Sequence, residues 1–401
     1  MTEIFLTIFF ISILLFFLGT GIWVAISMIG VSAFGMMLFT SRPVGDAMAT
    51  TIWGTTSSWT LTALPLFVWM GEILFRTKLS ENLFEGLSPW MQKLPGGLIH
   101  VNVVGCALFA AISGSSAATV ATVGKMSIPE LRKRNYPEKI LLGSLAGSGT
   151  LGLLIPPSII LIIYGVTVQE SIAKLFIAGI LPGIMIAIFF MLYVIVWSLI
   201  NKKLMPKSFE NFSLFEKIRR SKKLLPVIIL ILAVIGSIYT GIATATEAAS
   251  LGVVGALLLS YLQKSLTIQT FKQSLLGATK TSCMIAFILA GSSFLSLAMG
   301  FTGLPRNLAI WIESMQLSPY ILIIVLMIFY IILGMFLDGI SAVVLTMAII
   351  EPMIRQAGFD MIWFGIFLVV VVEMAQITPP VGFNLFVLQG MANKDMGYIA
   401  R

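Results

Sequence analysis

Hydroxyl and carboxylate side chains stand out at a few places within the apolar segments of this sequence. Ser113, Ser115 and Ser116 form one such cluster, and Asp338 with Ser341 forms another. A hard cation such as Na+ prefers oxygen ligands, which serine hydroxyls and a carboxylate supply. An ionisable group is costly to bury in apolar surroundings, so a functional role is the default expectation for Asp338. These residue types predict a cation site.

A pair of consecutive prolines, Pro156 and Pro157, lies within the apolar run of residues 140–166. Proline removes an amide donor and glycine has a weak helix propensity, so the stretch from Gly147 to Ser158 is predicted to break the helix. In lipid, freed backbone groups need partners, and a break is tolerated only where protein buries it or where it lines a polar cavity. The half-helix ends would present partial charges and carbonyl groups to an ion or a solute.

The composition places these motifs in a membrane protein. Of the 401 residues, 58% are hydrophobic and only 10% are charged, whereas about 25% are charged in soluble proteins. The net charge of +8 comes from short basic clusters between apolar segments, where the positive-inside rule predicts them. We therefore expect no nucleic-acid partner. The predicted fold class is an all-α polytopic membrane protein in a lipid bilayer.

Apolar runs of sufficient length predict the membrane-spanning helices. The predicted spans are residues 4–39 as a pair turning near Gly19, 52–75, 140–166, 175–200, 224–262 as a pair turning near Thr240, 283–300, and 361–390 with a break at 376–384. Shorter segments of mixed polarity are predicted to lie along the interface as arm helices. They are residues 80–93, 265–280 and 305–317.

Two further apolar segments, residues 98–128 and 320–353, carry turn signals at their centres. Basic residues flank the first on both sides, which argues against a crossing and predicts a re-entrant hairpin. The second segment repeats this pattern. The resulting topology puts the N-terminus in the periplasm and the C-terminus in the cytoplasm. All but four of the 25 Lys and Arg residues then lie on the cytoplasmic side, the exceptions being Arg42, Lys174, Arg306 and Arg355.

An internal repeat relates the two hairpin regions. Ser116 recurs as Ser341, 225 positions later, and the prolines at 156–157 recur at 379–380, 223 positions later. An odd number of predicted crossings separates the copies, so the second copy is inverted. The two hairpin tips are then expected to meet near the midplane, opposite the two Pro-Pro breaks. This arrangement is typical of the binding site of a secondary transporter.

The repeat divides the chain into four predicted parts. Residues 1–97 hold scaffold spans and the first arm helix, and residues 98–173 hold the first hairpin and broken helix of a transport domain. Residues 174–318 hold scaffold spans and further arm helices. Residues 319–401 hold the second hairpin and broken helix of the transport domain.

The candidate site residues lie at the tips and breaks. One sodium site is expected between Ser113, Gly114 and Ser116 at the first tip and Gly147 and Thr150 near the first break. Its counterpart is expected among Gly334, Asp338, Ser341, Gln376 and Thr378. An organic anion would use amide groups at the helix N-termini that follow Gly114 and Pro157, beside Ser115, Ser116, Asp338 and Thr378. The alternative is that these hydroxyls only pack the hairpin arms, as small residues often do in membranes.

Four motifs together resemble a known family. They are AAISGSSAAT at 110–119, LIPPS at 154–158, FLDGIS at 336–341 and ITPPVGFN at 377–384. They are similar to segments of the large membrane subunit of tripartite ATP-independent periplasmic (TRAP) transporters, and the similarity covers essentially the whole chain.

This resemblance implies sodium-driven uptake of an organic acid across the bacterial inner membrane by an elevator-like motion. Sialic acid, C4-dicarboxylates and keto acids are all open as substrates. A periplasmic binding protein would deliver the substrate, and a small four-helix membrane subunit, expected as a separate chain, would brace the large one.

Two other functions are considered. A sodium/carboxylate symporter of similar architecture would work without a binding protein. An intramembrane enzyme would need a paired nucleophile and base or a metal cluster, and the sequence offers neither, so we expect no enzyme activity.

Overall fold

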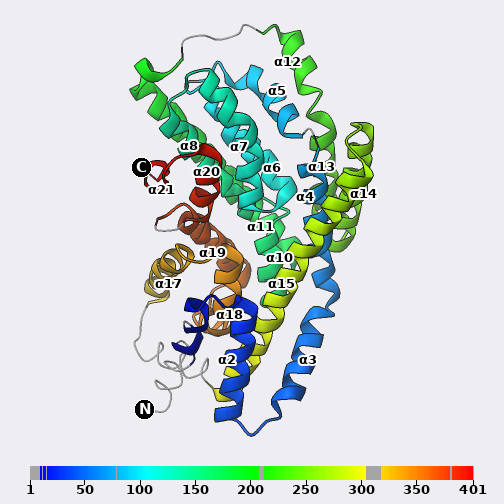
Figure 1. Ribbon diagram of the computed structural model, residues 1–401, viewed down its shortest axis with the longest axis vertical. Helices are drawn as coiled ribbons and strands as arrows, with labels where there is room; N and C mark the ends of the chain where they lie inside the picture. The colour runs from blue at the N-terminus through cyan, green and yellow to red at the C-terminus, as the bar shows by residue number, and fades with distance from the viewer. Residues whose placement is uncertain are drawn as a thin grey trace.

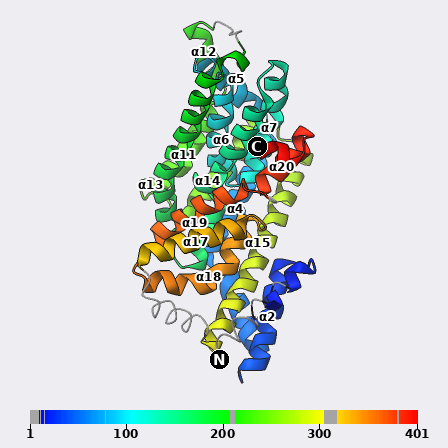
Figure 2. The ribbon, with the colours of Figure 1, turned by 90° about the vertical axis from the view of Figure 1, so that its left-hand side faces the viewer.

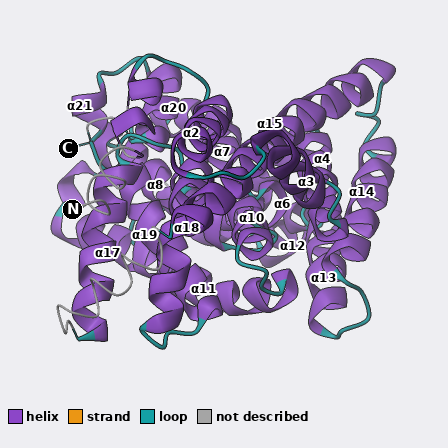
Figure 3. Cartoon of the chain, turned by 90° about the horizontal axis from the view of Figure 1, so that it is seen from below, coloured by secondary structure: helices purple, strands orange, loops and turns teal. Residues whose placement is uncertain are grey.

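The computed structural model describes residues 10–400 except 11, 15, 78, 207–211, 304–317 and 380–381. Within these residues every regular element is a helix (Figures 1 and 3). Five helices are long and apolar enough to cross a membrane, or up to seven if each of two bent pairs is one span. The predicted helix at 305–317 lies outside the described residues. The all-helical, apolar architecture agrees with the predicted class.

A single long helix, α15 (Ile268–Thr302), contacts α2 (Val24–Phe39), α3 (Val44–Thr56) and α4 (Ala63–Phe75). It runs diagonally from the upper right of the molecule to its lower end beside α2 (Figure 1). The prediction of a separate arm at 265–280 followed by a span at 283–300 is therefore wrong. A capping box at Thr267 begins the helix and Gly303, with a φ of 72°, ends it, and no proline intervenes between them.

The predicted span at 52–75 is also corrected. The chain is already helical from Val44 in α3 and bends by 53° before continuing through the short η1 (Trp59–Thr62) into α4. At the bend the Ser57 hydroxyl donates to the Trp53 carbonyl at 2.6 Å. A Ser or Thr hydroxyl that donates to the carbonyl four residues earlier competes with the backbone hydrogen bonds of the helix and often bends it. Alongside α4 packs α14 (Ala245–Leu262), which follows α13 (Leu225–Tyr239).

The first hairpin consists of α6 (Ile99–Ser113) and α7 (Ser116–Lys133), as its turn signal predicts. It follows α5 (Leu79–Met91), which lies with α12 (Leu214–Ser221) at the top of Figure 1.

The first broken helix comprises α8 (Glu138–Gly149), α9 (Leu151–Leu154) and α10 (Ile159–Thr167). The break is narrower than predicted, because the glycines at 147 and 149 remain in α8, Thr150 keeps helical dihedral angles between α8 and α9, and the chain leaves the helical conformation only at residues 155–158. A glycine costs about 1 kcal/mol in a helix, whereas a proline costs about 3. In the most apolar 18-residue stretch of residues 138–167, 89% of the residues are buried, so protein shields the interruption from lipid. In the next helix, α11 (Ile172–Ile200), only 22% of the most apolar 18-residue stretch is buried. This helix therefore leaves an apolar surface for lipid.

The second hairpin and broken helix repeat this order. They are α17 (Pro319–Gly334), α18 (Gly339–Gln356), α19 (Met361–Gln376) and α20 (Phe383–Ala392), followed by α21 (Met396–Ile399). Figure 2 shows α17, α18 and α19 stacked across the middle of the molecule. The two repeats exchange partners, because α10 packs against α18 and α20 packs against α7.

Candidate functional site

The tip of the first hairpin is a tight turn closed by hydroxyl groups. Gly114, with a φ of 59°, ends α6, and the Ser115 hydroxyl accepts from the Ala118 amide to begin α7. The Ser113 hydroxyl lies 3.0 Å from the Thr119 hydroxyl, which donates to the Ser115 carbonyl at 2.7 Å. Three oxygen atoms therefore gather at this tip.

The first tip lies directly against the first break. The Ile159 amide donates to the Gly114 carbonyl at 3.2 Å. A Cβ atom on Gly114 would lie 2.7 Å from the Pro157 carbonyl oxygen. Only glycine fits here, because both its positive φ and this close approach exclude a side chain.

The tip of the second hairpin is organised by a carboxylate. Asp338 Oδ2 accepts from the amides of Ile340 and Ser341, each at 3.1 Å, and so caps α18. Gly339 faces the last turn of α19, where a Cβ atom would meet Val372 and Gln376. The carboxylate therefore caps the N-terminus of α18 and satisfies two of its free amide groups.

One hydrogen bond joins the first tip to the second break. The Ser116 hydroxyl, at the start of α7, donates to Gln376 Oε1 at 2.8 Å. Both side chains are buried, and Gln376 is the last residue of α19. The bond brings together two residues 260 positions apart.

A cavity of about 620 Å³ opens between the two tips. Six of the predicted site residues line it: Ser113, Gly114, Ser115, Ser116, Asp338 and Gln376. Its remaining lining is mostly apolar and comes from α4, α7, α9, α10, α15, α18 and α20. Most of the predicted tip residues therefore line one cavity.

Three predicted residues of the first repeat do not line this cavity. Gly147 lies inside α8 and faces Phe190 of α11. The Thr150 hydroxyl donates to the Gly147 carbonyl at 2.7 Å. Pro157 touches the first tip through its carbonyl oxygen. Gly147 and Thr150 therefore lie outside the lining of this cavity.

Three predicted residues of the second repeat also lie beside the cavity rather than in its wall. Gly334 packs against Ala375. Ser341 is buried and contributes its amide to Asp338. The Thr378 hydroxyl donates to the Met374 carbonyl at 2.6 Å. These residues support the break and the tip.

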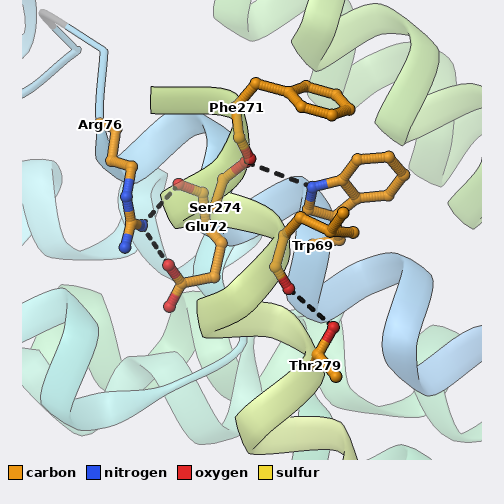
Figure 4. Close-up of polar contacts among 7 residues, drawn as sticks. Trp69, Glu72, Arg76, Phe271, Ser274 and Thr279 are labelled. Carbon is orange, nitrogen blue, oxygen red and sulfur yellow. Dashed lines mark hydrogen bonds and ion pairs between the residues drawn. The ribbon is translucent and has the colours of Figure 1, made fainter. Parts of the chain in front are cut away.

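Helix α4 supplies cavity residues that the sequence reasoning did not select. Glu72 lines the cavity and pairs with Arg76 one turn later. Figure 4 shows this ion pair, with Trp69 on the same helix reaching Ser274 of α15. A Cβ on Gly71 would lie 3.2 Å from Ser113 Cα, so α4 directly meets the first tip. A charged residue within an apolar segment was the available signal for Glu72.

A second intramembrane acid, Glu373, lies in α19 away from the cavity lining. It is 4% exposed, and its Oε1 atom has no hydrogen-bond partner among the described residues. The described residues contain no group of three or more His, Cys, Asp or Glu side chains placed to hold a metal. The oxygen donors at the two tips are hydroxyl, carbonyl and single carboxylate groups, which fit a monovalent hard cation.

The apolar all-helical fold, with its paired hairpins, interrupted helices and a cavity between the hairpin tips, is that of an integral membrane transport protein. Among solved structures, the Alcanivorax borkumensis YdaH transporter matches with a TM-score of 0.59 and 12% identity, over 88% of this chain and 82% of that chain. This likeness concerns the fold alone.

Sequence comparison places the chain in a family. Residues 11–401 match the DctM component of the tripartite ATP-independent periplasmic transporters, and the chain belongs to this family, as its motifs predict. A C4-dicarboxylate TRAP transporter large permease of Pseudomonas aeruginosa is 33% identical over 92% of this chain and 86% of its own length. The 2,3-diketo-L-gulonate large permease YiaN of Escherichia coli is 32% identical over 86% of this chain and 81% of its own length.

A third relative, the isethionate permease DctMQ of Oleidesulfovibrio alaskensis, is 30% identical over 96% of this chain and 60% of its own length. All three relatives are named as transporter permeases. The chain is accordingly a transport protein and not an enzyme.

Proposed function

We propose that this protein is the large subunit of a TRAP transporter that takes up a C4-dicarboxylate or a related organic acid by sodium symport. The Ser116–Gln376 hydrogen bond inside the tip-lined cavity carries this proposal, because it makes both inverted halves contribute to one site. The named substrates of the relatives, which are C4-dicarboxylates, 2,3-diketo-L-gulonate and isethionate, support a small organic anion. Sialic acid belongs to the same class of candidates.

Sodium would bind at the oxygen-rich parts of the two tips. Ser113, the Ser115 carbonyl and Thr119 form the first donor set, and Asp338 with Gln376 forms the second. These groups are hard ligands that suit Na+. The anion would bind at the first tip, where the amide groups after Gly114 begin α7. The cavity-lining residues that come from the first hairpin include no acidic side chain.

The proposed motion is an elevator, in which hairpins and interrupted helices move against α4 and α15. The contacts between these parts support it. Gly71 of α4 meets the first tip through backbone atoms, and the Ser292 hydroxyl of α15 donates to the Val344 carbonyl of α18 at 2.6 Å.

The proposed partners are a periplasmic binding protein and a small membrane subunit of four helices. The proposed location is the bacterial inner membrane, with the N-terminus in the periplasm and the C-terminus in the cytoplasm. The description of the matched family as tripartite and periplasmic supports these partners and this location.

Proteoliposomes with the large subunit, the small subunit and the binding protein encoded beside them test the proposal. Radiolabelled succinate, sialic acid and a keto acid are offered with an inward sodium gradient or an equal potassium gradient. We expect uptake of one acid only with sodium and only with the binding protein present. Equal uptake without sodium would exclude symport, and equal uptake without the binding protein would favour the independent symporter.

A further inference from the structure

Two arginines occupy matching places in the inverted repeats. Arg355 follows Arg132 by 223 positions, the same offset that relates the two Pro-Pro pairs. Arg132 lies in the last turn of α7 and Arg355 in the last turn of α18. Each therefore lies one residue before the end of the second helix of a hairpin.

Each arginine reaches across to the other repeat. Arg132 Nη2 donates to the carbonyl of Ala392, the last residue of α20, at 2.9 Å. Arg355 Nη2 donates to the carbonyl of Val168, which caps α10, at 3.1 Å. In both cases the accepting residue directly precedes one with a positive φ, Asn393 or Gln169. The two contacts are thus the same contact made twice.

The chemistry of a helix C-terminus explains why arginine is suited to this place. The last carbonyl groups of a helix lack intrahelical partners and carry the negative end of the helix dipole. A guanidinium group offers a fixed positive charge and several rigidly held donors. It can therefore bind a terminal carbonyl and a carboxylate together.

Carboxylates hold each guanidinium in position. Arg132 pairs with Glu138 at the start of α8. Arg355 pairs with Glu351 at 2.9 Å and lies 3.9 Å from Glu170. We call the contacts of Arg132 with Ala392 and of Arg355 with Val168 the arginine clasps.

The clasps join the far ends of helices whose near ends meet at the cavity. Helix α7 begins at Ser116, which bonds to Gln376 at the break before α20. Helix α18 begins at Gly339, whose Cβ would lie 3.2 Å from Ile160 near the start of α10. The arginine clasps therefore lie at the ends of the two crossed helix pairs that are remote from the cavity. In Figure 1 the pair of α7 and α20 lies above the pair of α10 and α18.

We propose that Arg132 and Arg355 are positioning residues that hold α20 on the first hairpin and α10 on the second. They keep both halves of the cavity together as one body. We call this attachment of each hairpin to a helix of the other repeat the crossed coupling. The consequence for transport rests on the proposed function, whereas the crossed coupling does not.

Hydrogen–deuterium exchange of the purified complex tests the coupling without any substrate. In Arg132→Gln, the amides of residues 383–392 should exchange about fivefold to tenfold faster, while those of residues 159–167 stay unchanged. Arg355→Gln should give the reverse pattern. The expected size reflects a charged hydrogen bond reduced by partial exposure of both arginines. Lys133→Gln and Lys174→Gln remove exposed charges nearby and should change neither segment.

Equal acceleration of both segments, or acceleration only in the helix that carries the substitution, would overturn the crossed coupling. Arg132→Lys and Arg355→Lys keep the positive charge but lose the rigid set of guanidinium donors. The amides of the partner helix should therefore exchange at rates between those of the unmodified protein and the glutamine variant. They also keep the proposal testable if a glutamine variant does not fold.

Uptake kinetics then test positioning against simple support of the fold. We expect the glutamine variants to raise KM about fivefold, with the maximal rate per folded transporter nearly unchanged and lysine giving partial rescue. An unchanged KM together with a lower maximal rate would overturn the positioning role. If the unmodified protein takes up no organic acid, the proposed function fails, and the exchange pattern still decides the crossed coupling.

Discussion

The two hairpin tips occupy equivalent places in the repeats but are built differently. The first tip closes through uncharged groups, because the Ser115 hydroxyl caps α7 and the Gly114 carbonyl accepts a hydrogen bond from the Ile159 amide of the same repeat. The second tip closes through the Asp338 carboxylate, which caps α18. One tip is therefore neutral and lined by amides and hydroxyls, and the other carries a negative charge.

This difference assigns distinct chemistry to the two halves of one cavity. A carboxylate attracts a cation and repels an organic anion at short range. A neutral turn at a helix N-terminus has the opposite preference. We therefore expect the coupling ion to depend most on the second tip and the organic acid to depend most on the first.

The largest expected effect comes from adding one methyl group to each tip glycine. Gly114→Ala places a side chain at a positive φ, which costs about 1–2 kcal/mol, and sets it 2.7 Å from the Pro157 carbonyl. Gly339→Ala meets Val372 Cγ1 at 2.8 Å, a side chain that can rotate. Thermal unfolding in detergent should show the larger loss for Gly114→Ala, with nearly complete loss of uptake. Equal losses would contradict the comparison.

Removing the charge of the second tip should act on sodium. Asp338→Asn keeps a polar N-cap but lacks the carboxylate, so we expect the sodium concentration for half-maximal uptake to rise about tenfold. Asp360→Asn is the matched control, because Asp360 caps α19 in the same way and does not line the cavity. A similar rise in both variants would assign the effect to helix capping.

The hydrogen bond between the tip and the opposite break can be measured by a double-mutant cycle. Ser116→Ala, Gln376→Ala and the double variant should give a coupling free energy of about 0.5–1.5 kcal/mol in unfolding or substrate binding. A coupling near zero would mean that the two residues act independently. Ser292→Ala, which removes a bond outside the cavity, serves as the single-site control.

The smallest effect on stability and transport is expected for Glu72, which α4 contributes to the cavity lining. Glu72 and Arg76 are both partly exposed, so Glu72→Gln should change stability by only about 0.2–1 kcal/mol. Because Glu72 adds negative charge to the cavity, we expect a modest decrease of KM for the anion. Substrate titration at fixed sodium measures this change. An increase of KM would indicate that Glu72 positions the substrate through Arg76.

Much of the architecture was predictable because it follows from local chemistry. Proline lacks an amide donor wherever it stands, so the interruptions at 155–158 and after Gln376 follow from the sequence. The hairpin turns at Gly114 and Asp338 follow from glycine and capping residues. The repeat offset, read one step further, also pairs Arg132 with Arg355.

Other features depended on packing among distant segments. The sequence alone determined where backbone groups lose their helical partners, because that deficit is a property of single residues. Only the tertiary structure decided that Gln376 accepts a hydrogen bond from Ser116, that Gly147 faces α11, and that α15 is one continuous helix. The apolar helix surfaces are chemically alike, so their choice of neighbour is set by shape and by the few polar bonds that cross between repeats.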